Sequence, residues 1–279
     1  ATTRAGTNEY RGSAYHYFRN DALDAANFFA NATGTRKSPL RYNQSGVTFG
    51  GPVLIPKLYN GRNASFFFVS YEATRIRNGR TAQLNVPTAA QREGDFNPAG
   101  YRGNQPVFDP ATTRANPSGA GFLRDAFPGN RVPAARITPF AKSVLTLYPA
   151  AAIDVPRGNN FFATLSDDSN NDQVLTRFDH RFGAKDSVFF RYSWFDGIDS
   201  NKSPIDQGGS SNDVRTQNLS FNYVRMFGPS TLNELRLGYN RPVYLILQDG
   251  AYKENWSRRL GLRNLLSDPI GWGVPQIGL

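Results

Sequence analysis

Strand-like, aromatic-rich runs of about ten residues recur along the chain, and the connections between them are alternately short and long. The clearest pair, Asp172–Phe182 and Ser187–Phe195, is joined by the short turn Gly183–Asp186. A second pair follows at Thr216–Phe227 and Thr231–Arg241, and a long polar stretch separates the two pairs. Short turns on one side and long loops on the other are typical of a transmembrane β-barrel, whose tilted strands need ~9–11 residues each.

Three more strands are predicted before these four, at Glu9–Arg19, Asn43–Val53 and Ala64–Arg77. The segment 78–171 has no strand signal, and we interpret it as a long extracellular loop. The expected fold is therefore all-β: a partial transmembrane antiparallel β-barrel, seen as an open curved sheet of about seven strands.

One short helix is predicted inside the long loop. Thr138 is a suitable N-cap, Pro139 fits the first helical position, and Pro149 ends the run. Its apolar residues Val144 and Leu147 fall on one face with Phe140, so we expect the helix to pack the loop down rather than to bind a partner.

Alternate residues of the predicted strands fall on two faces of unlike character. In a barrel the apolar, often aromatic face meets lipid, and the charged face lines a wet lumen. The lipid-facing candidates are Phe67, Tyr71, Phe178, Phe190, Tyr192, Trp194, Phe221, Tyr223, Leu237 and Tyr239. The lumen-facing candidates are Glu72, Arg177, Asp179, Arg181, Arg191, Glu234 and Arg236.

The composition offers little catalytic chemistry. The 279 residues include no cysteine, which excludes disulfides and thiolate sites. The net charge is +10, but the basic residues are spread singly rather than in a patch, so nucleic-acid binding is not predicted. His16 and His180 each lie alone in a predicted strand, and no phosphate-binding or nucleophile motif is present. We therefore expect a protein that is not an enzyme and that has no cofactor.

Calcium is the one ion for which the sequence offers ligands. Asp167, Asp168 and Asp172 lie close together near the end of the predicted loop, and carboxylates on a loop can bind Ca²⁺. The cluster lacks the glycine and the final glutamate of an EF-hand loop. We therefore predict no cofactor and keep a loop calcium site as the alternative.

The chain begins without an initiator Met or a signal peptide and stops in a glycine-rich stretch. We interpret it as a piece of a longer protein, so the missing targeting signal says nothing about its location.

Several stretches, in the same order along nearly the whole chain, resemble one family, the TonB-dependent outer-membrane receptors of the Oar-like type. The ordered set is specific, although each stretch alone is weak. The stretches are Gly6–Ala14, Phe18–Phe29, Asn43–Gly46 with Gly50–Pro52, Ser65–Glu72, Val86–Thr88 with Gly94–Phe96, Phe127–Asn130, Arg136–Ile137, Arg177–His180 and Leu232–Arg236.

The resemblance implies a receptor in which a carboxypeptidase-regulatory-like domain and a plug precede a barrel of ~22 strands. Residues 1–8 would be the end of the plug region or a linker. Residues 9–279 would be the N-terminal part of the barrel, with 78–171 as a long extracellular loop. The implied partners are outer-membrane lipid, an unidentified extracellular ligand, and the inner-membrane TonB complex, which would act through regions outside this chain.

Two alternatives remain at this stage. One is a structural or adhesive outer-membrane barrel that does not transport. The other is a secreted β-sandwich that binds glycans through aromatic residues, because a soluble sandwich shows the same alternation with its apolar face turned inward.

Overall fold

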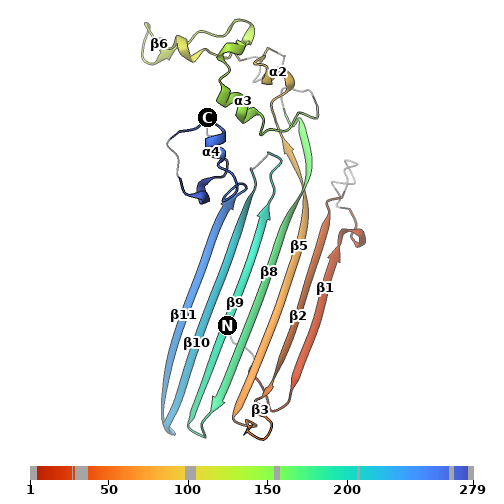
Figure 1. Cartoon of the computed structure of the whole chain (residues 1–279), viewed down its shortest axis with the longest axis vertical. Coiled ribbons are helices and arrows are strands. Elements are labelled where there is room, and N and C mark those ends of the chain that lie inside the picture. The colour runs from red at the N-terminus through yellow and green to blue at the C-terminus, as the bar shows by residue number, and fades with distance from the viewer. Residues whose placement is uncertain are drawn as a thin grey trace. The chain divides into compact units, whose positions relative to one another are not determined.

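The computed structural model describes residues 5–26, 28, 37–97, 105–153, 158–205, 208–263 and 267–275. Seven long strands form one antiparallel meander, in which each long strand lies beside the next one along the chain (Figure 1). They are β1 (Arg11–Asn20), β2 (Leu40–Pro52), β5 (Ser65–Leu84), β8 (Phe161–Arg181), β9 (Asp186–Asn201), β10 (Ser210–Gly228) and β11 (Thr231–Gln248). The predicted all-β fold is confirmed, with seven strands in the predicted order.

The strands are longer than predicted at one end. β5 continues to Leu84 and β8 begins at Phe161, so the segment between these two long strands is 85–160 rather than 78–171. The polar stretch after Phe195 is likewise shortened from both sides by β9 and β10. The prediction was wrong at these boundaries because the added strand ends are rich in Ser, Asn, Asp and Arg, which carry no apolar alternation and were interpreted as loop.

The antiparallel order places the connections of the sheet at two opposite ends. At one end, residues 182–185 join β8 to β9 and residues 229–230 join β10 to β11. The β2–β5 connection at this end contains a small hairpin of β3 (Leu54–Ile55) and β4 (Tyr59–Asn60). The connections that follow β1, β5 and β9 lie at the other end. Those after β1 and β5 are long, as predicted. Residues 202–209 between β9 and β10 are fewer than residues 53–64 between β2 and β5, so the predicted alternation of short and long connections is confirmed only in part.

The described residues divide into two compact units. The sheet unit includes most of the long strands, and the loop unit is built from 80–165, 202–210 and the segment after β11. Among the described residues, no helix is long and apolar enough to cross a membrane. The helices are α2 (Ala89–Arg92), α3 (Pro139–Leu145) and α4 (Trp256–Arg259), with 3₁₀ turns at Asp21–Leu23, Pro110–Thr112, Pro128–Asn130, Ala134–Arg136 and Pro269–Gly271. The loop unit also has a hairpin of β6 (Arg114–Ala115) and β7 (Phe122–Leu123).

The predicted loop helix is confirmed as α3. The Thr138 hydroxyl accepts a hydrogen bond from Ala141 N, and Pro139 is the first helical residue. Leu147 is buried against Trp256 and Leu260, and Phe140 and Val144 pack on the same cluster. The helix thus joins the core of the loop unit, as expected for a helix that packs its loop down.

Two arginines stabilise the loop unit around α3. Arg92 donates to the carbonyl oxygens of Leu145, Tyr148 and Pro149, at and just beyond the C-terminal end of the helix. Arg136 donates to both carboxylate oxygens of Asp109. This pair, with a further hydrogen bond from Ala111 N, holds the pKa of Asp109 below its usual value.

Gly46 of β2 leaves room for the ring of Tyr15, which extends from β1 across β2. Tyr15 lies opposite Gly46 in the β1–β2 pair, and its ring covers the position that a Cβ at Gly46 would occupy. The Tyr15 hydroxyl reaches across β2 and donates to Glu72 of β5. Close packing against Tyr15, rather than the backbone conformation, therefore requires a glycine at position 46.

Gly46→Val is expected to destabilise the full-length barrel by about 1–3 kcal/mol, because the new side chain displaces Tyr15 and breaks its hydrogen bond to Glu72. The matched control is Gly238→Val, since the nearest atom to a Cβ at Gly238 is Leu219 O at 3.8 Å. The control should be close to neutral. Urea unfolding of both variants in lipid vesicles measures the difference, and equal costs would contradict the packing account.

Candidate membrane-facing site

The β8–β9 register brings predicted lipid-facing residues together on one face. Phe178 lies opposite Phe190, and Thr176 lies opposite Tyr192. Residues directly opposite in an antiparallel pair share a face, and their neighbours along the strand point to the other face. Arg177, one position from Phe178, therefore lies on the reverse side.

Side-chain contacts extend this aromatic face to neighbouring strands. Tyr71 of β5 donates to Asp172 of β8 at 2.6 Å, and Gln217 of β10 donates to the Tyr192 hydroxyl at 3.1 Å. We call this side of the sheet the aromatic face. By register and alternation it carries all ten lipid-facing candidates, which are Phe67, Tyr71, Phe178, Phe190, Tyr192, Trp194, Phe221, Tyr223, Leu237 and Tyr239.

The reverse side, which we call the charged face, is also continuous across the strands. Arg191 of β9 donates to Ser220 of β10 at 3.0 Å, and Asn222 of β10 donates to Glu234 of β11 at 2.6 Å. It carries all seven lumen-facing candidates, which are Glu72, Arg177, Asp179, Arg181, Arg191, Glu234 and Arg236. Which of the two faces meets lipid stays a prediction.

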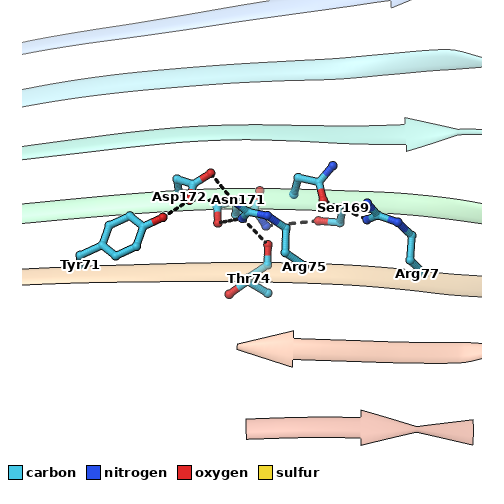
Figure 2. A network of polar contacts seen from close by, with 8 residues as sticks. Tyr71, Thr74, Arg75, Arg77, Ser169, Asn171 and Asp172 are labelled. Atoms are coloured by element: carbon cyan, nitrogen blue, oxygen red, sulfur yellow. Dashed lines mark hydrogen bonds and ion pairs between the residues drawn. The ribbon is translucent and has the colours of Figure 1, made fainter. Parts of the chain in front are cut away.

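A row of ion pairs crosses the aromatic face toward the end with the long connections. Arg75 of β5 donates to both carboxylate oxygens of Asp172, at 2.8 and 2.7 Å (Figure 2). Asp172 lies directly opposite Asp196 of β9, which accepts from Arg215 of β10 at 2.7 Å. Each of the two opposed carboxylates is thus neutralised by an arginine on its outer side, so the row across the four strands has no net charge.

A second polar level lies toward the short turns. Asp186 of β9 accepts from the Tyr223 hydroxyl at 2.6 Å and lies 3.8 Å from Arg225 of β10. On both strands ten residues separate the levels, from Asp186 to Asp196 and from Arg215 to Arg225. At ~3.3 Å per residue and a tilt of ~35–45°, this spacing corresponds to roughly 25 Å, which is the height of the apolar band of a transmembrane barrel.

Most side chains between the two levels are apolar, and several of them are exposed. Phe178 and Phe190 near the middle are 41% and 42% exposed, and Leu237 is 59% exposed. Toward the short turns the rings of Tyr10 and Phe49 stack with centroids 5.8 Å apart, and Phe67 lies next to Phe49. Aromatic residues at the edge of an apolar band are typical of the membrane interface.

Arginine side chains on the charged face form ion pairs with carboxylates of the same face. Arg177 donates to Asp179 at 2.7 Å and covers the ring of Phe189 at 4.4 Å. Arg236 donates to Glu234 at 2.6 Å. A surface of paired charges suits contact with water better than contact with lipid, because charged groups are costly to transfer into hydrocarbon.

The segment before β1 lies against this charged face. Asn8 accepts a hydrogen bond from Asn63 N at 2.7 Å, and Gly6 is packed so closely that a Cβ would lie 2.6 Å from Phe67 O. Residues 5–8 line a cavity of about 410 Å³ together with Arg177, Asp179, Arg181, Phe189 and Asn222 of the sheet. No local pattern predicts the course of this segment, because the course depends on contacts between residues far apart in the chain.

The calcium alternative placed its ligands in a loop, and that placement was wrong. Asp167, Asp168 and Asp172 lie within β8, where Asp172 is bound by Arg75 and Asp168 lies 3.2 Å from Arg77. Asp167 lies on the opposite face from Asp168 and Asp172, and those two are four residues, roughly 13 Å, apart along the strand, so the three carboxylates do not converge on one ion. The described part of the chain contains no group of three or more His, Cys, Asp or Glu residues that could hold a metal.

Comparison with protein families agrees with this geometry. A family described as an outer membrane beta barrel domain matches residues 2–279. The chain belongs to this outer membrane beta barrel family. No curated protein and no solved structure matches the chain.

Family membership assigns this outer membrane beta barrel chain to the bacterial outer membrane. Membership of this family also argues against the alternative of a secreted, soluble β-sandwich. The long strands of the barrel chain form a single seven-stranded sheet rather than two sheets packed face to face.

The barrel topology predicts which connections are reached from outside the cell, because short turns lie on the periplasmic side of bacterial barrels. Epitope tags inserted after Asp24 or Arg114 in the full-length protein should bind antibody on intact cells, and tags after Ala184 or Ser230 should not. The predicted third insertion site, at position 206 between β9 and β10, lies outside the described residues. Antibody access to the short turns alone would contradict this orientation.

Proposed function

We propose that this chain is part of a TonB-dependent outer-membrane receptor that binds an external ligand and imports it with energy from the inner-membrane TonB complex. The ordered sequence motifs support this proposal, and so does membership of the outer membrane beta barrel family. The role is binding and transport rather than catalysis, and the ligand is unidentified.

The observation that carries the proposal is the course of the segment before β1. Residues 5–8 run along the charged face, beside Arg177 and Asp179, instead of leaving the sheet into the periplasm or along the aromatic face. A plug that fills a barrel must connect to the first strand from inside the lumen. The segment follows the path that such a connection requires.

The outer ends of the strands supply a surface for ligand capture. β5 and β8 have 20 and 21 residues, about twice the ~9–11 needed to cross the bilayer. The loop unit has its own core of Leu147, Trp256 and Leu260, so its surface is held in a fixed shape. Binding residues are often carried on loops that a rigid scaffold positions.

Direct binding to TonB tests the proposal. The full-length protein in detergent should bind the purified periplasmic domain of TonB, as measured by calorimetry. A variant that starts at residue 5 should not bind, because the contact lies upstream of the barrel. Heat-modifiable migration on gels shows whether each protein is folded.

Absence of TonB binding by the folded full-length protein would contradict the proposal. It would favour a structural or adhesive barrel instead. Equal binding by both proteins would show that the contact does not require the region before the barrel, which also contradicts the proposed arrangement.

A further inference from the structure

Two arginines face each other on the aromatic face beyond the row of ion pairs. Arg41 of β2 lies directly opposite Arg77 of β5. Like charges at directly opposed positions of a sheet destabilise the pair. Such an arrangement is costly unless an anion lies between or above the two guanidinium groups.

The two arginines differ in their partners. Arg77 lies 3.2 Å from Asp168 and donates to Asn170 at 2.9 Å, both on the β8 side. Among the residues that the structure describes, Arg41 makes no side-chain hydrogen bond or ion pair, and Arg41 is exposed. No described residue therefore forms an ion pair with Arg41 that would offset its repulsion with Arg77 directly.

Neighbouring side chains add to the positive character of this site. Arg75, two positions from Arg77, lies opposite Asn43, and Arg41 lies opposite Asn20. Asp168 and Asp172 are each bound by one arginine. Asp21 accepts a hydrogen bond from Leu40 N, and Lys37 donates to the carbonyl oxygen of Asp21. Three arginines and one lysine thus stand against three carboxylates, which leaves one net positive charge near Arg41.

The site lies where lipid headgroups would be. Arg75 and Arg77 follow Tyr71 by four and six residues, on the side away from the apolar band. Tyrosines are common at the membrane–water interface, so the arginines begin just beyond the hydrocarbon region. Their position on the aromatic face directs them to the outer leaflet if that face meets lipid.

We propose that Arg41, Arg75 and Arg77 bind the phosphate groups of an outer-leaflet glycolipid, such as the lipid A part of lipopolysaccharide. Guanidinium groups recognise phosphate oxygens through paired, charge-assisted hydrogen bonds. A membrane lipid is favoured over free phosphate because the site is open and lies next to an apolar surface that would contact acyl chains. The inference rests on the barrel and its faces and is independent of TonB dependence.

The wild-type protein tests the phosphate requirement without any substitution. Native mass spectrometry of the full-length protein in detergent should show a bound bisphosphorylated lipid A, and dephosphorylated lipid A should bind at least tenfold more weakly. Millimolar inorganic phosphate should not displace the lipid. Equal binding of the two lipids would overturn the proposal, and complete displacement would show a site for free phosphate instead.

Arg41→Gln locates the site. It should weaken binding of bisphosphorylated lipid A roughly tenfold, because it removes a cation with no described partner in the sheet. The matched control is Arg181→Gln, which removes an exposed arginine from the charged face. Unchanged binding by Arg41→Gln, or equal loss in both variants, would overturn the assignment to the aromatic face.

Discussion

Phe190→Arg is expected to destabilise the full-length barrel by about 2–4 kcal/mol in lipid vesicles, because an arginine near the bilayer midplane must leave water. Phe190 lies four residues from Asp186 and six from Asp196, the two polar levels of β9. Its side chain points from the aromatic face between them. Urea unfolding in vesicles measures the cost.

The neighbouring Phe189 provides the matched control. It undergoes the same chemical change but lies on the charged face, beside Arg177 at 4.4 Å. Phe189→Arg should cost about 1 kcal/mol, through the lost cation–π contact and the new repulsion, because a wet lumen hydrates the added charge. A larger cost for Phe189→Arg than for Phe190→Arg would show that the charged face meets lipid and the aromatic face meets water.

The 279 residues expressed alone are expected to aggregate, or to require detergent. In the described sheet β1 and β11 each pair with one neighbour, so each leaves a row of unpaired backbone groups. Free edges invite pairing with other chains. Exposed apolar residues on the aromatic face, such as Leu235 and Leu237, add a second cause of association.

Size-exclusion chromatography with light scattering checks this expectation, with the full-length protein in the same detergent as control. The full-length protein should remain monodisperse because its barrel closes. A monodisperse monomer of the isolated 279 residues in plain buffer would contradict an open sheet with a lipid-facing side.

Much of the sheet could be predicted because apolar alternation is a local signal. Phe178, Phe190 and Tyr192 alternate with charged residues over the stretch that a bilayer would cover. Thr138 and Pro139 likewise predicted where α3 begins, since capping depends on a few adjacent residues.

The outer ends of the strands could not be predicted in the same way. There the aromatic face carries Arg75, Arg77 and Asp172, which form ion pairs between strands. These pairs depend on the register of residues almost a hundred positions apart, which no local pattern reveals. The acidic residues of β8 therefore resembled a calcium loop, and the opposed pair Arg41 and Arg77 gave no signal at all.

The central claim is that the aromatic face of this outer membrane beta barrel chain meets lipid and the charged face meets water. Single cysteines at Phe190, Arg191 and Tyr192 of the otherwise cysteine-free sequence test it most directly in the full-length protein. We expect cysteines at 190 and 192 to react with a lipid-soluble maleimide, and a cysteine at 191 to react with a water-soluble one. The reverse labelling pattern would contradict the account.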